Sequence, residues 1–214
     1  PLSIGLLATA IGIPRLRPLA SPRRASRVGL LMMLAGTAVL IGGLEVGASA
    51  AIVSWPLLLI GLGIGALASQ LGAVVVSAVP EDEAPEVGGL QNTVTNLGAS
   101  MGTALVGSLL IAALSASLAS GIQANPNIPQ AAKQEASVKL AGGIPFLSDE
   151  QLRSALDQAG VPSATADEVV KENTKARYDG LRVSLSVVML VGILGLFLSG
   201  VLPARAIGAR DGPG

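Results

Sequence analysis

The sequence predicts an all-α integral membrane protein, and its composition and charge distribution carry that prediction. Of the 214 residues, 50% are hydrophobic and only 13% are charged, against about 25% charged residues in soluble domains. The charges gather in short stretches, which leaves long uncharged windows at 1–14, 28–44, 46–80, 87–132 and 183–204. Because roughly 20 mostly apolar residues cross a bilayer, we expect transmembrane helices at about 1–13, 28–46, 55–78, 87–119 and 180–202.

Several classes of function find no support in the composition. The chain has no cysteine and no histidine, and its formal net charge is zero. Disulfides, thiol nucleophiles and histidine chemistry are therefore excluded, and nothing favours nucleic acid as a partner. We expect no enzyme activity, no metal and no cofactor. Because the chain begins at Pro1 without signal-peptide features, we interpret it as the C-terminal part of a longer protein.

The first two spans, 1–13 and 28–46, are separated by a basic loop at 14–27. The loop holds five arginines and no acid: Arg15, Arg17, Arg23, Arg24 and Arg27. Positive residues in short loops favour the cytoplasmic side, so we place this loop inside. A lipid-binding or nucleic-acid-binding patch is the weaker alternative, because the loop is short and lies between two spans.

The third span, 55–78, carries a stripe of small residues. Trp55 favours a membrane interface, and Pro56 suits the first turn of a helix. The residues Gly61, Gly65, Ser69 and Gly72 follow at spacings of four, four and three. Such a stripe is typical of the close-packing face of a membrane helix.

The fourth span, 87–119, follows an acidic inner loop at 79–86 and begins with a polar face. Gln91, Asn92, Thr95 and Asn96 recur at helical spacings, with Gly98 and Gly102 beside them. This face could line a transport path, or it could bond and pack against a neighbouring helix. Packing is favoured, since such bonds average only about 0.6 kcal/mol and need no functional explanation. Gln70 in the third span has the same two interpretations.

Acidic residues are confined to the ends of the spans and to the loops. Glu45 lies at the outer end of the 28–46 span. Carboxylates inside the membrane often relay protons, but one near a helix end reaches water. We therefore favour an interfacial role for Glu45 over a proton relay.

The long polar segment, 121–179, is predicted to be extracytoplasmic and helical. Its turn signal is Asn125-Pro126-Asn127. Ser148 and Gln151 predict a capping box at the start of a helix, and Gly160 can end that helix. A second capping box is expected from Thr165 and Glu168.

The last span, 180–202, is expected to stop at Pro203. A tail at 203–214 follows, and it carries Arg205 and Arg210. These arginines favour the cytoplasmic side. The C-terminus is therefore predicted to be cytoplasmic.

The third and fourth spans also carry a family pattern. Its elements are Val79-Pro80, Ala84, Gly89-Leu90, Asn92-Thr93, Leu97-Gly98, Gly102 and Ala104-Leu105, with a closing stretch DGLRVSLSVVML. The pattern resembles the late helices of the 14-helix drug:proton antiporters of the major facilitator superfamily. The resemblance covers nearly the whole chain except the outer segment.

The resemblance implies that the five spans are the last five of a multidrug efflux antiporter in the cell membrane. Its partners would be the bilayer, the N-terminal helices of the same protein and a small-molecule substrate, which it exports by alternating access in exchange for protons. The 14–27 loop would lie where the superfamily repeats G-x-x-x-D-R-x-G-R-R, of which only arginines remain. The coupling carboxylates would lie in the earlier helices.

Two rival functions stay open. One is a non-transporting membrane scaffold or sensor that works through the 121–179 segment. The other is a major facilitator carrier for a metabolite, lipid or sugar. Proton-driven efflux by the whole protein would separate transport from scaffolding.

Overall fold

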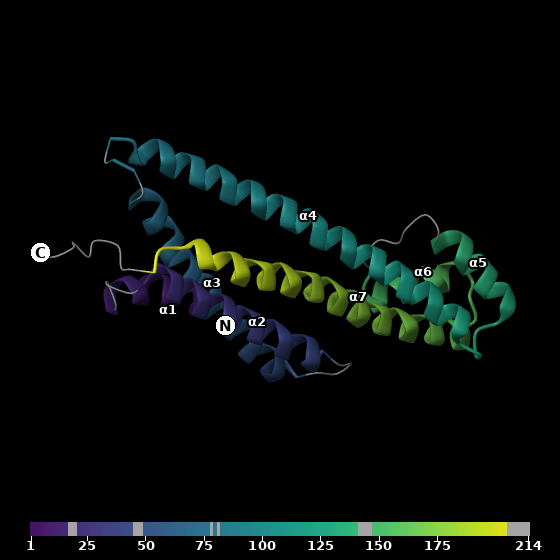
Figure 1. Cartoon of the computed structure of the whole chain (residues 1–214). Coiled ribbons are helices and arrows are strands. Elements are labelled where there is room, and N and C mark those ends of the chain that lie inside the picture. The colour runs from purple at the N-terminus through teal and green to yellow at the C-terminus, as the bar shows by residue number, and fades with distance from the viewer. Residues whose placement is uncertain (17–20, 45–48, 78, 81, 141–146, 205–214) are drawn as a thin grey trace, which may run out of the picture. The chain divides into compact units, whose positions relative to one another are not determined.

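The computed structural model describes the chain except residues 17–20, 45–48, 78, 81, 141–146 and 205–214, and the described residues are helical, with no strand among them (Figure 1). The elements are α1 Leu2–Leu16, α2 Pro22–Gly43, α3 Ala50–Ser77, α4 Ala84–Ala124, α5 Gln130–Leu140, α6 Asp149–Gln158, α7 Ser163–Leu198 and the 3₁₀ turn η1 Ser199–Val201. The prediction of an all-α chain is confirmed.

The chain divides into two compact units. The first unit comprises Pro1–Gly43, Ala48–Gly102 and Val188–Gly214, and the second comprises Leu44–Gly47 and Thr103–Val187. The helices α4 and α7 each contribute one part to each unit.

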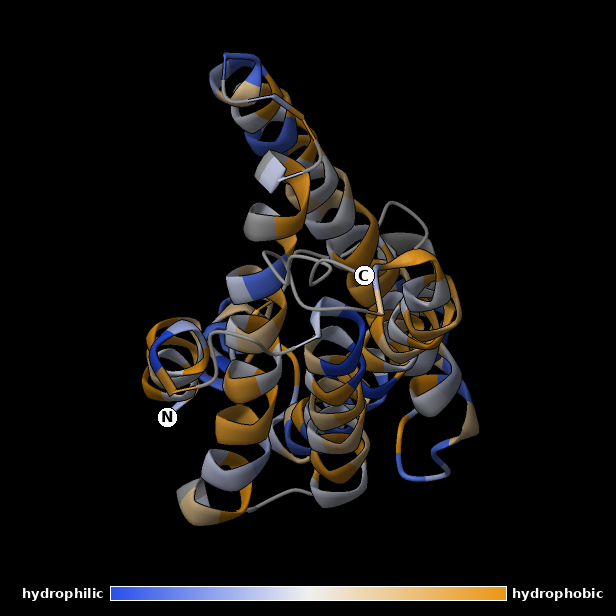
Figure 2. Ribbon diagram, turned by 60° about the vertical axis from the view of Figure 1, so that its left-hand side comes forward, coloured by the Kyte–Doolittle hydropathy of each residue, from blue (hydrophilic) through white to orange (hydrophobic). Residues whose placement is uncertain are grey.

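Four of the described helices are long and apolar enough to cross a membrane. Their apolar segments are Pro22–Gly43, Ala51–Gly72, Ala84–Ala124 and Ser163–Val201. Hydrophobic residues, in orange, make up much of the helical ribbon (Figure 2). The helix at the first predicted span, α1, has 15 residues, or about 22 Å at 1.5 Å per residue. That is shorter than the ~30 Å hydrocarbon core of a bilayer.

The second and third helices begin earlier than the sequence predicted. Helix α2 starts at Pro22, so Arg23, Arg24 and Arg27 lie in its first turns rather than in a loop. Proline at a first helical position and arginine after it both suit a helix. Helix α3 starts at Ala50, which places Pro56 in its interior, fully buried.

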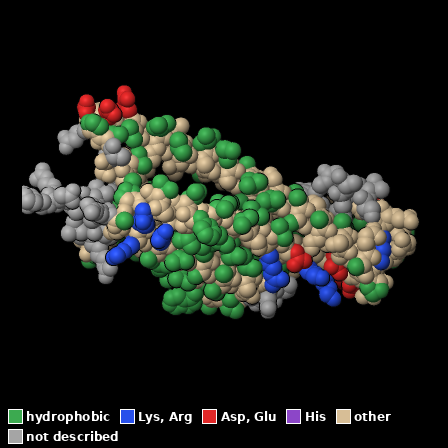
Figure 3. Space-filling model, viewed as in Figure 1, with side chains coloured by type: hydrophobic (Ala, Val, Ile, Leu, Met, Phe, Trp, Pro, Cys, Tyr) green, Lys and Arg blue, Asp and Glu red, His purple; other side chains and the backbone are tan. Residues whose placement is uncertain are grey.

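Helix α4 begins close to its predicted start. Its first residue is Ala84, so Pro85 lies in the first turn, where proline is favoured, together with Glu86. An acid at this position is favourable beside the positive end of the helix dipole. Acidic side chains gather beside the start of α4 (Figure 3), where Asp82, Glu83 and Glu86 are all exposed.

Glycines set the close packing of the first unit. A Cβ built on Gly5 would lie 2.6 Å from the carbonyl oxygen of Leu58, and one on Gly29 would lie 2.8 Å from that of Gly63. The backbones of α1 and α2 therefore approach α3 closely, as small residues allow in membrane helices. Thr9 of α1 completes the α1–α3 contact by donating to the Leu62 carbonyl at 2.8 Å.

In the second unit α4 and α7 run antiparallel. Ser117 donates to Asp179 at 2.9 Å, and Asn125 donates to Glu168 at 2.9 Å. Residue numbers therefore increase along α4 in the direction in which they decrease along α7. The core between the helices consists of Leu114, Leu118, Ile122, Ile128 and Ala176, with side chains of α5 packed against it.

Helix α6 follows the sequence prediction closely. The hydroxyl of Ser148 accepts from the Gln151 N–H at 3.1 Å, and the Gln151 side chain accepts from the Ser148 N–H at 2.9 Å. The predicted capping box is confirmed. Gly160 follows the helix with φ +71°, the left-handed conformation that a helix end often needs.

The rest of the outer segment differs from prediction. The second capping box is wrong, because Thr165 lies inside the first turn of α7 and not before it. Pro162 takes the place before the helix, and its carbonyl accepts from the N–H groups of Thr165 and Ala166. Helix α7 then continues without a break through position 180, since no helix breaker interrupts it.

Candidate functional site

The polar face of α4 borders a hollow of about 350 Å³. Gln91, Asn92 and Thr95 line the hollow from α4, and Ala68 and Leu71 line it from α3. Gly88, one turn before Asn92, also borders it. We call this space the α4 hollow.

The amides of the polar face are partly satisfied within α4. Asn96 donates from Nδ2 to Oδ1 of Asn92 at 3.2 Å, which fits residues four apart on one helix face. Asn92, Thr95 and Asn96 are exposed, and Gln91 is partly buried. Three of the four predicted residues thus meet at the α4 hollow, and Asn96 supports one of them without lining it.

Gln70 does not join this group. It is buried in α3 at 8% exposure, and its Nε2 donates to the Ser69 hydroxyl at 3.4 Å. It is not among the residues that line the α4 hollow. The two helices also approach each other at Gly72, where a Cβ would lie 3.8 Å from Nε2 of Gln91.

The four glycines predicted to pack closely have different surroundings. A Cβ on Gly61 or Gly65 would overlap the backbone of α1 at Leu2 and Leu6. Around Gly98 and Gly102 no other described atom lies within 4 Å of a built Cβ. Close packing of Gly98 and Gly102 therefore stays a prediction, and no described residue of this chain is the partner.

The predicted cytoplasmic arginines contact the end of α7. Arg23 donates from Nε to the carbonyl of Leu202 at 2.8 Å, and Arg27 donates from Nε to the hydroxyl of Ser199 at 3.2 Å. Cations near the C-terminus of a helix interact favourably with its carbonyls and dipole. Arg15 and Arg24 are exposed.

Some sequence predictions fall outside the described residues. Arg17 and Glu45 belong to this group, as do Arg205 and Arg210 of the tail. The contact between Arg23 and Leu202 joins residues 179 positions apart, so no local pattern could have revealed it.

The α4 hollow offers hydrogen bonding without ionisable groups. Its described lining consists of amide, hydroxyl and apolar groups, with no acid or base among them. Amides and hydroxyls both donate and accept, so the hollow can hold a polar group of a ligand or of another helix. Among the described residues no group of three or more acidic side chains could hold a metal ion.

The Asn92-Thr93 element of the family pattern lies on α4 beside this hollow. No family model matches this chain, and neither a curated protein nor a solved structure matches it. Membership of the major facilitator superfamily is therefore a proposal that rests on the sequence pattern.

Proposed function

We propose that the chain is part of a secondary active transporter of the major facilitator superfamily, one that exports drugs or other small amphipathic molecules in exchange for protons. The observation that carries the proposal is the polar row of Gln91, Asn92 and Thr95 on a 41-residue apolar helix, beside a hollow shared with α3. Polar groups at membrane depth need partners, and a transported molecule can supply them.

The surroundings of the row suit an amphipathic substrate. The large apolar side chains Leu90, Val94 and Leu97 are exposed on the same part of α4, each by more than half. A path formed by this surface would offer apolar contact together with a few hydrogen-bonding groups, the usual make-up of small-molecule sites.

The mechanism we propose is alternating access, with these helices moving against the remaining helices of the transporter around a site near the membrane midplane. The α4 hollow has no titratable lining, so the group that carries the proton would come from those other helices. In this arrangement α4 binds and orients the substrate, and the coupling chemistry occurs elsewhere.

The proposed orientation places the first-turn arginines of α2 and the C-terminus in the cytoplasm, and the helices α5 and α6 outside. The support is the positive charge of Arg15, Arg23, Arg24 and Arg27 near the membrane-length helices. The proposed location is the cell membrane.

The test is transport by the natural protein that carries this chain, purified and reconstituted into liposomes. A fluorescent amphipathic cation such as ethidium is loaded, and its movement is followed with and without a pH gradient. We expect movement that depends on the gradient and stops when a protonophore collapses it. A folded, correctly inserted protein that moves no probe under any gradient would overturn the proposal.

A scaffold or sensor is the second candidate, and one observation favours it. The second unit has a hydrophobic core of its own, built on Leu114, Leu118 and Ile122, which a separately folding module needs. The same liposomes separate the two candidates, because a scaffold does not dissipate a pH gradient when substrate is added.

A further inference from the structure

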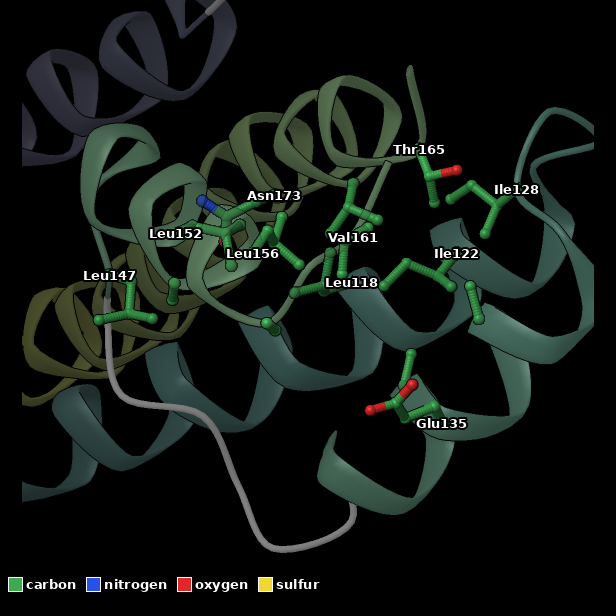
Figure 4. A pocket seen from close by; sticks show the side chains of 15 residues that line it. Leu118, Ile122, Ile128, Glu135, Leu147, Leu152, Leu156, Val161, Thr165 and Asn173 are labelled. Carbon is green, nitrogen blue, oxygen red and sulfur yellow. The ribbon is translucent and has the colours of Figure 1, made fainter. Parts of the chain in front are cut away.

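The second unit contains an apolar pocket of about 260 Å³. Side chains from α4, α5, α6 and α7 surround it (Figure 4). Leu118 and Ile122 of α4 and Leu152 and Leu156 of α6 form much of its apolar wall. We call it the second-unit pocket.

We propose that this pocket binds a small, uncharged, mainly apolar molecule that carries one hydroxyl or similar polar group and enters from water. The site is separate from the α4 hollow, which is built from residues of the first unit. The proposal therefore stands whether or not the protein is a transporter.

The size and lining of the pocket set the class of ligand. An apolar cavity of about 150 Å³ stays dry and takes up benzene, so one of about 260 Å³ accepts a larger molecule, such as a two-ring aromatic. Small-molecule sites combine an apolar lining with few polar groups, and the second-unit pocket has this composition.

The polar lining of the pocket consists of the exposed side chain of Glu135 and two buried polar side chains. Thr165 is 7% exposed and Asn173 is 4% exposed, and both line the pocket. The Nδ2 of Asn173 is engaged, donating to Asp149 at 3.0 Å. Within the described part of the chain, no side-chain hydrogen bond engages the Asn173 oxygen or the Thr165 hydroxyl. Both atoms can accept a hydrogen bond, and the Thr165 hydroxyl can also donate one, so the hydroxyl of a ligand could bond to either.

Polar contacts join α6 to α7 beside the pocket. Asp149, at the start of α6, accepts from Asn173 and from the Thr174 hydroxyl at 2.9 Å. Farther along α6, Arg153 pairs with Asp167 of α7. These polar contacts join α6 to α7 at two points, so part of the pocket wall is positioned by interactions that do not involve a ligand.

The absence of cysteine from the sequence permits a labelling test on the full chain in lipid nanodiscs. Ala159→Cys places a thiol in the pocket lining directly after α6, and Ser154→Cys places one on α6 outside the lining; both positions are exposed. The rate of reaction with a water-soluble maleimide is measured against increasing 1-naphthol. We expect saturable slowing of at least fivefold at position 159 and no change at position 154.

Variants separate specific binding from partition into lipid. Ala155→Phe fills the pocket from α6, and Ala164→Phe adds the same bulk at an exposed position that does not line it. Protection by 1-naphthol should be lost in the first and kept in the second, with equal helicity by circular dichroism. Thr165→Val should weaken protection by 1-naphthol several-fold and leave protection by naphthalene unchanged.

The outcomes that overturn the proposal are equally definite. Equal slowing at positions 154 and 159, or no slowing at the solubility limit of 1-naphthol, means that no such site exists. A further arm uses dihexanoyl phosphatidylcholine as the probe. Protection by this lipid and not by 1-naphthol identifies the occupant as an acyl chain and rejects a water-borne ligand.

Discussion

Arg23 of α2 donates a hydrogen bond from Nε to the carbonyl oxygen of Leu202 at 2.8 Å. The N–H of Arg23 also donates to the carbonyl of Pro203 at 3.2 Å. The first turn of α2 thus donates hydrogen bonds to carbonyl groups just after α7, and Arg23 and Leu202 are 179 residues apart in the chain.

Arg23→Ala should lower stability, because it removes a charge-assisted bond to a carbonyl at a helix end. Such bonds contribute about 1.5–3 kcal/mol. Arg24→Ala is the matched control, since Arg24 is its exposed neighbour, and it should change stability by less than about 0.5 kcal/mol. Thermal unfolding of the chain in nanodiscs measures both. Equal losses in the two variants would contradict a specific role for Arg23.

Gly65→Ala should destabilise the first unit, because the added Cβ would overlap the carbonyl of Leu6 and the hydroxyl of Thr9. Overpacking of this kind costs about 1–3 kcal/mol. Gly98→Ala should instead be neutral or stabilising by up to about 1 kcal/mol, through helix propensity, since open space surrounds Gly98 among the described residues. The stability of the two variants is compared in the isolated chain.

The same Gly98→Ala variant tests whether α4 packs on other helices of a larger transporter. There the substitution should impair transport or assembly even though the isolated chain is unharmed. Unchanged transport in liposomes would argue against close packing at that position.

Asn125→Ala should destabilise the second unit by about 1–3 kcal/mol, because it removes the hydrogen bonds of a buried side chain and leaves two partly buried carboxylates without that partner. Its Nδ2 donates to both Glu168 and Glu172 at 2.9 Å, and its Oδ1 accepts from the N–H of Asn127. Asn127→Ala, at an exposed position, is the control. Amide hydrogen exchange in α7 around Glu168 and Glu172 measures the effect. Equal protection of these amides in both variants would contradict a stabilising role for Asn125.

Ser148→Ala should loosen the start of α6 by about 1 kcal/mol, since a helix N-cap of this kind contributes that much. Ser154→Ala, in the same helix, should have a smaller effect. Faster hydrogen exchange confined to α6 in the first variant is the expected result. Uniform exchange across α6 in both would show that the cap contributes little.

Thr95→Val should reduce transport several-fold if the α4 hollow binds substrate, because the change removes a hydroxyl and keeps the shape. Thr93→Val is the matched control, since the hydroxyl of Thr93 donates to the Gly89 carbonyl of its own helix at 3.0 Å. The reconstituted natural protein provides the measurement. Equal transport by both variants would assign Thr95 to packing.

The elements that the sequence predicted well carry a local signal. Membrane-length apolar windows predicted α2, α3, α4 and α7, because hydrophobicity over about 20 residues reflects one physical requirement. The capping box at Ser148 also involves neighbours only three residues apart. Helix α5 was missed, although Pro129 followed by alanine, lysine and glutamine is a readable helix start.

Features that depend on tertiary contact could not be predicted in this way. Helix α2 begins at Pro22, before the predicted span at 28–46, because five arginines indicate the side of a membrane and say little about where a helix begins. The α4 hollow depends on how Gln91 meets α3 near Gly72, and the second-unit pocket depends on the placement of α6. Spacing on one helix does not fix either arrangement.

The bond between Arg27 and Ser199 has a consequence for biosynthesis. Its two residues are 172 positions apart, and at about 5–20 residues per second the ribosome makes the second roughly 10–30 s after the first. During that interval the guanidinium has no Ser199 to bind, and water or lipid headgroups are its available partners. The same arginine can thus contact water or lipid headgroups first and bind the end of α7 later. Exchange of Arg23 and Arg27 for lysine would keep the positive charge that acts in the first stage. It would remove the Nε donors that form the later bonds to Leu202 and Ser199, so only the second stage should be affected.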